Sequence, residues 1–331
     1  MQLTTPVEAR KSFLEITHRE SILLLGSCFA QNIGNRLLEN KFPACVNPFG
    51  TLYNPLSIAT ALHRIVTGEE FTHSSPEIFE SGEKWHSILH HGDYSRCEKS
   101  ELLAAINSPL QKAHETIRTA RTVILTFGTA YVYVRKSDNC VAGNCHKLPA
   151  ALFTRKLLSI NEIVETTAHC IDEILGINPD ARILFTVSPI RHLRDGAHDN
   201  QKSKATLLLA IDELQKLYPT CTAYFPAYEI MLDELRDYRF YAEDMAHPSP
   251  LAVEYIWERF TACHIAGESI ALCKEIAPIM RALAHRPFDE RSSGYKEFIG
   301  NTLQKIETIK GKHPYIDFEK EIEKCNIQLS K

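Results

Sequence analysis

The sequence predicts an α/β fold in which helices cover both faces of a parallel β-sheet. Segments with the apolar period of a helix alternate with short apolar runs of strand length, and this alternation is typical of parallel sheets buried on both faces. The strand-length runs lie at 22–25, 44–46, 123–127, 183–187 and 223–225. We therefore expect a three-layer sandwich with these strands in its central sheet.

Two of the helical segments are marked clearly by their apolar faces. After the first strand, Phe29, Ile33 and Leu37 are spaced four residues apart, which places them on one side of a helix. Between the third and fourth strands, a second apolar face covers 160–175 and stops at Gly176. Both segments are expected to pack on the sheet as crossover helices.

Other segments leave this alternating pattern. Residues 69–109 show little periodicity and are expected to form an insertion over one end of the sheet. Residues 131–141 alternate aromatic and β-branched side chains before a turn at 137–139, which predicts a hairpin. The C-terminal part is helical and more charged, so we expect a helical appendage at 266–331 after a domain at 1–265.

The charge composition indicates which kinds of binding partner to expect. The 331 residues carry a formal net charge of −4, with 37 lysines and arginines against 41 aspartates and glutamates. This balance predicts no cationic surface for nucleic acid or for an anionic membrane. We therefore expect a small, neutral or modestly polar substrate, with no cofactor, no nucleic acid and no membrane as partner.

The cysteines and the N-terminal residues bear on the compartment. Ten cysteines are scattered along the chain, and the first residues lack the apolar stretch that a secretory signal needs. A reducing compartment keeps thiols free, so we expect a cytoplasmic protein whose cysteines are small packing residues. Cys140, Cys145 and His146 alone do not make a zinc set.

The first strand leads directly into a serine, Ser27, and then into a helix. Ligands of open parallel sheets bind at the carboxyl ends of the strands, so Ser27 lies where chemistry usually takes place. Gly26 permits a tight turn, and the following helix supplies N–H groups for a developing oxyanion. The competing interpretation is that Ser27 only caps the helix, which is a common role of serine. Cys28 is an alternative nucleophile, because a helix N-terminus favours a thiolate.

A second motif, Asp244-x-x-His247, follows the last strand and precedes a helix. Three-residue spacing on a turn lets the Asp244 carboxylate reach one ring nitrogen of His247 and leaves the other nitrogen free as a base. A serine nucleophile needs such a base. Taken alone, the motif is equally compatible with a surface Asp and His near a helix start.

Several blocks of this sequence resemble one family. The blocks are Gly26-Ser27-Cys28-Phe29-Ala30, Asn47 to Pro55, Phe127 to Ala130, Val141 to Lys147, Thr186 to His192, and Asp237 to Tyr241 leading to Asp244 and His247. With these blocks the chain is similar to the GSCFA family, whose members resemble SGNH-type hydrolases, over roughly residues 3–262. The resemblance implies a flavodoxin-like, SGNH-hydrolase-like sandwich.

The resemblance also implies roles for individual residues. Ser27 matches the nucleophile, Asp244 and His247 match the activating pair, and Gly50 matches the glycine whose N–H joins that of Ser27 in the oxyanion hole. The third block departs from the pattern. SGNH enzymes usually carry Gly-x-Asn there, and this chain has Gly128-Thr129-Ala130.

The missing asparagine leaves one oxyanion donor to be supplied from elsewhere. Thr129 stands in that block, and Asn144 or Asn54 is expected to offer an amide in its place. Without any substitute, the transition state loses on the order of 3 kcal/mol of stabilisation.

Further polar side chains are expected to contact the substrate. His86 and His90 are four residues apart, which on a helix would place both on one face as metal ligands; the favoured interpretation is that they line the cleft, as His146 also does. Arg191 follows the fourth strand and either binds a substrate carboxylate or phosphate, or pairs with Asp195 or Asp237.

Four hypotheses follow from these residues. The leading one is a serine hydrolase that cleaves a small acyl ester or an acylated sugar through Ser27, Asp244 and His247, without a metal. An acyltransferase would use the same site. A non-catalytic binding module would retain only the cleft, and a metal-dependent hydrolase would centre on the histidines at 86, 90, 91 and 146.

Overall fold

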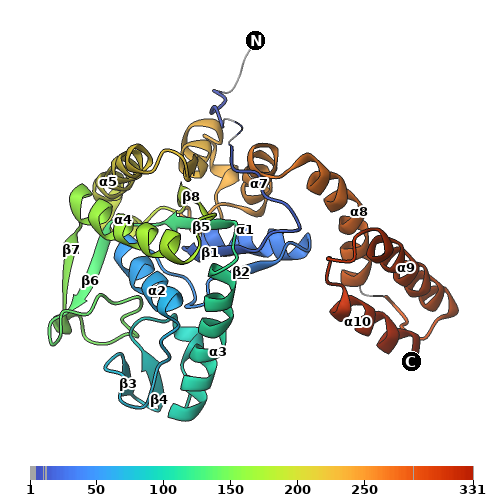
Figure 1. Cartoon of the computed structure of the whole chain (residues 1–331), viewed down its shortest axis with the longest axis horizontal. Coiled ribbons are helices and arrows are strands. Elements are labelled where there is room, and N and C mark those ends of the chain that lie inside the picture. Colours follow the sequence, from blue (N-terminus) through green and yellow to red (C-terminus); the bar gives the residue numbers. More distant parts are fainter. Residues whose placement is uncertain (1–4, 10, 12, 286, 331) are drawn as a thin grey trace.

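The structure, a computed structural model, describes residues 5–9, 11, 13–285 and 287–330. Figure 1 shows an α/β body with the C-terminal helices beside it. Within the described residues, no helix combines the length and the apolar composition needed to cross a membrane.

The central sheet has five parallel strands in the order β2–β1–β5–β8–β9. All five predicted strands are therefore confirmed. Numbered within this sheet alone, the order is the flavodoxin-like 2-1-3-4-5, which opens a crevice where the order reverses, at the carboxyl ends of β1 and β5. The strands are β1 (Ile22–Gly26), β2 (Ala44–Val46), β5 (Thr122–Phe127), β8 (Arg182–Val187) and β9 (Thr222–Phe225).

Helices bury both faces of this sheet, as predicted. Along β1, Ile22 and Leu24 face one helical layer, whereas Leu23 and Leu25 face the other. An apolar residue at every position is what a strand covered on both sides requires. One layer holds α2 (Pro55–Thr67), α3 (Lys99–Ile117), α4 (Ile160–Ile177) and α5 (Gly196–Leu217); the other holds α1 (Cys28–Glu39) and α7 (Pro250–His264).

Short helical segments connect these elements. They are η1 (Gly92–Tyr94), η2 (Ala150–Leu152), η3 (Leu193–Asp195), α6 (Ala227–Glu229), η4 (Ile230–Glu234) and η5 (Tyr238–Phe240).

The predicted insertion is shorter than the sequence indicated. Its first part, 69–98, contains an antiparallel hairpin of β3 (Ile78–Ser81) and β4 (Lys84–Ser87). Its last residues instead begin α3, a long helix that contacts the sheet and whose buried Leu102 and Ile106 belong to the main core. The helix was missed because Pro109, normally a helix breaker, lies inside it.

The predicted hairpin at 131–141 is only partly formed. The turn exists, since the Arg135 N–H donates to the Cys140 carbonyl at 2.8 Å, but the returning strand is reduced to one bridge between Val134 and Val141. The ladder partner of β6 (Tyr131–Arg135) is β7 (Phe153–Leu157), further along the chain. Sequence alternation identified the strand but not its partner.

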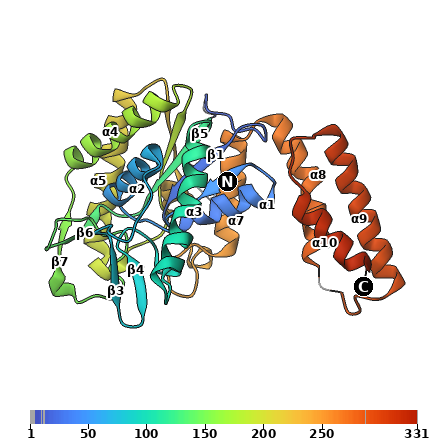
Figure 2. The ribbon, with the colours of Figure 1, turned by 60° about the horizontal axis from the view of Figure 1, so that its bottom comes forward.

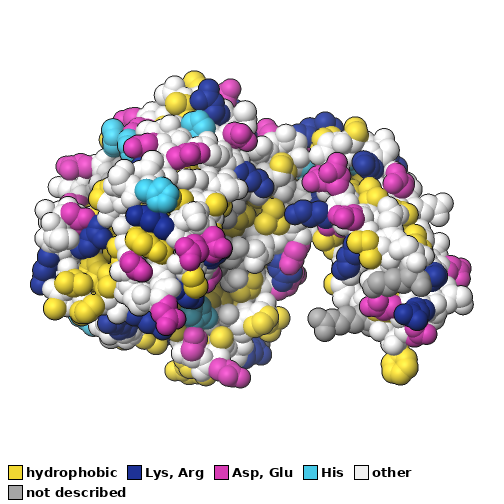
Figure 3. Space-filling view, turned by 90° about the horizontal axis from the view of Figure 1, so that it is seen from below, with side chains coloured by type: hydrophobic (Ala, Val, Ile, Leu, Met, Phe, Trp, Pro, Cys, Tyr) yellow, Lys and Arg dark blue, Asp and Glu magenta, His cyan; other side chains and the backbone are white. Residues whose placement is uncertain are grey.

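The C-terminal helices form a small bundle with its own core. They are α8 (Gly267–Ala284), α9 (Ser293–Lys312) and α10 (Glu319–Ser330), which lie side by side in Figure 2. Figure 3 shows an open notch between this bundle and the α/β body. Contacts across the junction include an ion pair of Lys41 with Glu321 and the guanidinium of Arg19, 4.2 Å from the centre of the Tyr315 ring.

The approach of β1 to β5 predicts a strict requirement for glycine at position 26. Gly26 has φ +147°, and a Cβ built there would lie 2.3 Å from the Thr126 carbonyl oxygen. We expect Gly26→Ala to lower the free energy of unfolding by about 2–5 kcal/mol, from backbone strain and overpacking together. Urea denaturation followed by circular dichroism measures this change.

Gly176→Ala is the matched control. Gly176 lies in the last turn of α4 with open space around its Cα, so alanine there is expected to raise stability by about 0.5–1 kcal/mol. Equal effects of the two substitutions would contradict the steric argument.

Candidate active site

A cavity of about 420 Å³ lies at the carboxyl ends of the sheet strands. Its wall combines loops that follow β2, β5 and β8 with the β6–β7 hairpin and the loop before α7, so segments far apart in sequence meet there. This is the place where open parallel sheets bind ligands. Lining residues that bear on function are Tyr53, Asn54, Thr129, Tyr131, Tyr133, Asn144, Arg155, Arg191, His192, Arg194, Asp195 and His247.

The structure brings Asp244 and His247 together as the spacing predicts. One carboxylate oxygen of Asp244 lies 2.5 Å from His247 Nδ1, and the other accepts the N–H groups of Ala246 and His247 at 2.9 Å each. These backbone N–H donors and the imidazole lower the pKa of Asp244 to about 2. The carboxylate thus stays charged and fixes the ring, which leaves Nε2 free. His247 lines the cavity and is half-exposed.

Ser27 is only 1% exposed and is not among the residues that line the cavity. It caps α1, since its Oγ accepts the Phe29 N–H at 3.2 Å. Gly128 lies close above it: a Cβ built on Gly128 would be 3.6 Å from Ser27 Cβ. Among the described residues, no hydrogen bond joins Ser27 Oγ to His247. Ser27 therefore acts as the N-cap of α1, and it is not hydrogen-bonded to the Asp244–His247 pair in this structure.

Gly50 does not offer the free oxyanion donor that we expected. Its N–H donates to the Asn47 carbonyl at 2.7 Å, so the turn itself consumes the donor. This turn needs a glycine for another reason. The φ of Gly50 is +75°, and a Cβ there would lie 2.3 Å from His91 Cβ.

The three residues considered as a replacement amide or hydroxyl have different surroundings. Asn54 caps α2, accepting the Ser57 N–H and donating to its Oγ at 2.9 Å, so its amide is engaged. The Thr129 hydroxyl bonds Ser203 Oγ at 3.0 Å. Asn144 accepts the His146 N–H with its oxygen, and its Nδ2 has no partner within the described part of the chain. Of these three residues, only Asn144 therefore retains a free donor at the cavity.

His86 and His146 do not line this cavity as expected. His86 lies on β4 rather than on a helix, with Nδ1 2.7 Å from Ser95 Oγ and Nε2 3.2 Å from the Ser81 carbonyl oxygen. His146 Nε2 lies 2.7 Å from the Ser87 carbonyl oxygen. Both rings thus hold loops of the insertion in place.

His90 is a core residue and not a ligand. It is fully buried, stacks on the Phe49 ring with centroids 4.3 Å apart, and burial lowers its pKa to about 3. The helical spacing of His86 and His90 was misleading because this segment is a strand followed by a turn. The described residues contain no group of three or more His, Cys, Asp or Glu side chains that is placed to hold a metal ion.

Cys28, the alternative nucleophile, contacts a tyrosine. Its Sγ lies 3.4 Å from the Tyr53 hydroxyl, and Tyr53 lines the cavity. Burial and this thiol raise the pKa of Tyr53 to about 12, so the phenol keeps its proton. The Tyr53 backbone carbonyl also accepts the N–H groups of Gly128 and Thr129 at 2.8 Å each, which holds the two loops together.

His192 also lines the cavity, although sequence reasoning gave it no role. Its buried Nε2 has no hydrogen-bond partner among the described residues and would lie 3.3 Å from a Cβ on Gly128, the same position that approaches Ser27. Burial, with smaller contributions from Lys204 and His247, lowers its pKa to about 4. The imidazole is therefore neutral at physiological pH and faces the serine region with an unused nitrogen.

A buried lysine, Lys204, lies behind this region. Its Nζ donates to the carbonyls of Gly128 and Ser188, both at 2.7 Å, and so links the ends of β5 and β8. Burial lowers its pKa to about 7. A sequence signal existed: Asn200, Ser203 and Lys204 occupy the same helical stripe as apolar Leu207, which is unusual for a core-facing helix.

Arg191 does not form either of the ion pairs considered for it. Asp195 pairs with Arg155 at 2.5 Å, and Asp237 pairs with Arg239 at 3.7 Å. The Arg191 guanidinium has no hydrogen-bond or ion-pair partner among the residues that the structure describes. It lines the cavity, and its backbone N–H donates to the Ala246 carbonyl at 3.1 Å, beside the Asp244–His247 loop.

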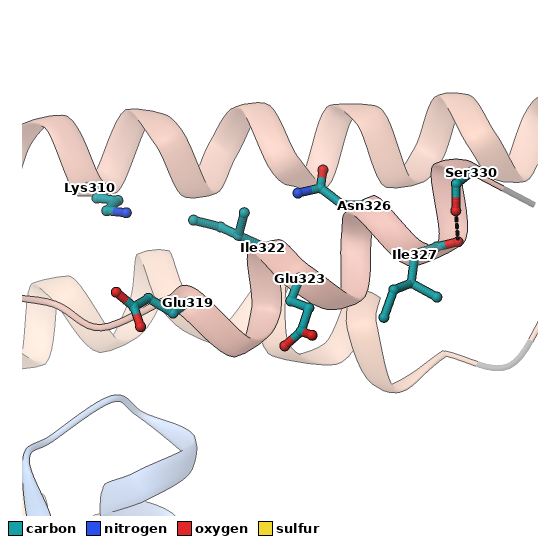
Figure 4. A pocket seen from close by; sticks show the side chains of 7 residues that line it. All are labelled: Lys310, Glu319, Ile322, Glu323, Asn326, Ile327 and Ser330. Carbon is teal, nitrogen blue, oxygen red and sulfur yellow. Dashed lines mark hydrogen bonds between the residues drawn. The ribbon is translucent and has the colours of Figure 1, made fainter.

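A separate groove on the C-terminal bundle offers no comparable chemistry. Figure 4 shows side chains of α10 lining it with Lys310 of α9, among them Ile322 and Ile327. The only hydrogen bond drawn there is local, from the Ser330 hydroxyl to the Ile327 carbonyl at 2.8 Å. The groove contains no nucleophile and base in contact.

Comparisons with known proteins give two family matches. The model of the GSCFA family matches residues 21–260, and the model of the GSCFA domain protein, C-terminal domain, matches residues 276–331. No curated protein matches the chain. One similar solved structure is an acetyl xylan esterase (Est2A) from the rumen bacterium Butyrivibrio proteoclasticus, with 12% identity and a TM-score of 0.32. The match covers 78% of this chain, which spans 65% of the length of that esterase.

The buried Lys204 predicts a pH-dependent contribution to stability. A folded pKa of about 7 lies below the ordinary value of 10.5, so between these values the unfolded chain binds a proton that the folded chain does not. The free energy of unfolding therefore rises with pH across this window, by about 1 kcal/mol per pH unit. Lys204→Met should remove this slope, as urea denaturation from pH 7 to 9.5 would measure.

Lys202→Met is the control, because Lys202 lies on the exposed side of the same helix and pairs with Asp199. A difference between wild type and Lys204→Met that stays constant with pH would show that the two carbonyls keep Lys204 charged.

Proposed function

The chain belongs to the GSCFA family, and from its candidate site we infer that it is a serine hydrolase acting on ester bonds. One observation carries this proposal: His247, which is hydrogen-bonded to Asp244, lines a cavity that Thr129 also lines, and Gly128, the residue before Thr129, lies close to Ser27. The substrate we propose is a small acyl ester, with an acylated sugar as one form.

The proposed reaction uses an acyl-serine intermediate. His247 Nε2 takes the proton of Ser27 Oγ, which attacks the ester carbonyl carbon; the tetrahedral intermediate then expels the alcohol, which receives that proton from His247. Water activated by His247 releases the acid and restores the serine. The Asp244 carboxylate holds the ring tautomer and stabilises the imidazolium that forms between these steps.

The proposal requires that Ser27 and His247 meet when substrate binds. In free enzymes, catalytic hydrogen bonds are often absent and form only in the substrate complex. The half-exposed His247 lies on the loop between η5 and α7, whereas Ser27 follows the end of β1. We propose that the substrate breaks the weak 3.2 Å bond from Phe29 N–H to Ser27 Oγ and recruits His247 to the serine.

The proposed oxyanion hole differs from the family pattern. Ser27 N–H donates to the Thr126 carbonyl at 3.4 Å, a long hydrogen bond that an oxyanion would have to replace. In place of the missing asparagine and the engaged Gly50, we propose that neutral His192 donates from Nε2. A positioned donor of this kind is worth about 100- to 1,000-fold in kcat.

One observation favours a second candidate, a non-catalytic binding module. Ser27 is almost fully buried and already caps α1, and the N–H of Gly50 is consumed. Such a module would bind its ligand in the same cavity without reacting at Ser27, so covalent labelling separates the two candidates.

The proposed nucleophile is tested with a fluorophosphonate probe. We expect the purified protein to form one adduct, located at Ser27 by peptide mass spectrometry and abolished by Ser27→Ala. His247→Ala should slow labelling by about 100-fold or more, because the general base is lost. His169→Ala is the control, since His169 lies on the exposed face of α4, where it faces Glu173, and should label like wild type. If no adduct forms at Ser27, or if His247→Ala is labelled as fast as wild type, the result supports the binding module.

The role of His192 is tested by comparing two substitutions. His192→Ala should lower kcat on p-nitrophenyl acetate by about 100-fold or more with little change in KM, because a donor used only in the transition state is lost. Glutamine places an amide nitrogen near the position of Nε2, so His192→Gln should recover most of that loss. Equal losses in both variants, with lowered thermal stability, would assign His192 to packing instead.

A further inference from the structure

The wall of the cavity is cationic, although the chain as a whole is acidic. Three arginines line it, Arg155, Arg191 and Arg194, against one aspartate, Asp195. The formal net charge of the whole chain is −4. An excess of positive charge at one concave place in an acidic protein marks a site that attracts an anion.

The three arginines are not equivalent. Arg155 is already satisfied: its guanidinium pairs with Asp195 and stacks 3.8 Å from the centre of the Tyr131 ring. Arg194 is exposed at the rim and has no ion pair among the described residues. Arg191 is half-buried at the wall and equally lacks a carboxylate. A partly desolvated guanidinium without an acceptor indicates that the acceptor is a ligand.

The surroundings of Arg191 support this interpretation. Burial raises the pKa values of two tyrosines near Arg191, Tyr228 and Tyr241, and the charge of Arg191 offsets part of each rise. Its backbone N–H is anchored to Ala246, one residue from His247. The free guanidinium therefore belongs to the same loop junction as the proposed base.

The rest of the wall suits a small cyclic ligand. Tyr53, Tyr131 and Tyr133 line the cavity, and tyrosine combines a broad apolar ring with a polar tip. A volume of about 420 Å³ lies in the range of small-molecule sites.

We propose that the ligand of this cavity is a small anionic ester, whose acyl group faces His247 and whose carboxylate or phosphate binds Arg191, with Arg194 adding charge at the rim. Guanidinium binds both kinds of oxyanion through two parallel hydrogen bonds. The ester part of this inference rests on the proposed function, whereas the anion site does not. It also replaces the neutral or modestly polar substrate that the overall composition led us to expect.

A matched pair of esters tests the charge requirement. 4-Acetoxybenzoate and methyl 4-acetoxybenzoate share the same acetyl ester and ring and differ by one negative charge. We expect wild type to prefer the anion by about tenfold to 100-fold in kcat/KM, the worth of a charge-assisted hydrogen bond. Arg191→Gln should reduce this preference to about twofold or less, mainly by raising KM, since ground-state binding is lost.

Arg118→Gln is the matched control for charge. Arg118 is exposed at the end of α3, at the amino ends of the strands, and its loss removes the same charge away from the cavity. The control should keep the full preference for the anion. A preference that falls equally in both variants would show a long-range effect of net charge and would overturn the proposed site.

A binding measurement separates failure of this inference from failure of the proposed function. Isothermal titration of Ser27→Ala with each ester measures binding to the anion site when no acyl transfer to Ser27 can occur. Adding Arg191→Gln to Ser27→Ala should abolish the difference in affinity between the two esters. If Ser27 is labelled by the fluorophosphonate but neither turnover nor binding prefers the anionic ester, the anion site is overturned and the proposed hydrolase stands. Binding of the anion that depends on Arg191, without labelling or turnover, overturns the hydrolase and supports the anion site.

Discussion

The close approach of β1 and β5 is the constraint on which the site depends. Gly26 has no room for a side chain against Thr126, and its N–H donates to Asn47 Oδ1 at 2.9 Å. The chain therefore turns sharply after β1, and Ser27 must begin α1 at the carboxyl edge of the sheet. Because the strand order reverses between β1 and β5, the loop that carries Gly128 is placed directly over this serine.

A buried polar layer holds the loops that follow β5 and β8, which contribute to the cavity wall. Lys204 holds the carbonyls that follow β5 and β8, and Asn200 on the same helix accepts the His192 N–H at 2.9 Å. Burying an amine in a core-facing stripe costs stability unless its hydrogen bonds are satisfied. Here two carbonyl acceptors offset that cost. The same contacts hold Gly128 and His192 in fixed positions near Ser27. The half-exposed side chain of His247 has no such buried contacts among the residues that the structure describes.

The sequence predicted what depends on local pattern and missed what depends on packing. Strands, helices and the 244–247 turn have short-range signals, so their positions follow from apolar period and residue spacing. The engaged N–H of Gly50 depends on turn geometry that residue type does not reveal. His90 follows the spacing of a helix, but its segment is a strand and turn, and only the structure shows its ring against Phe49. Lys204 was visible as a polar residue in an apolar stripe, but its acceptors come from two distant strands.

Exposure of the base bears on whether an acyl-enzyme would be hydrolysed or transferred. Acyl transfer requires that water be kept away from the intermediate while an acceptor alcohol is held in its place. The His247 side chain is 48% exposed, and Arg194 at the rim is open to solvent, so water reaches the position from which the base would activate a second nucleophile. An anionic group bound at Arg191 would be carried either on the alcohol half or on the acyl half of the ester. If that half is the alcohol, its departure after acylation empties the cationic wall and admits water, which favours hydrolysis. If it is the acyl half, the anion stays bound and delays release of the acid, so the position of the charge in the ester decides which step limits turnover.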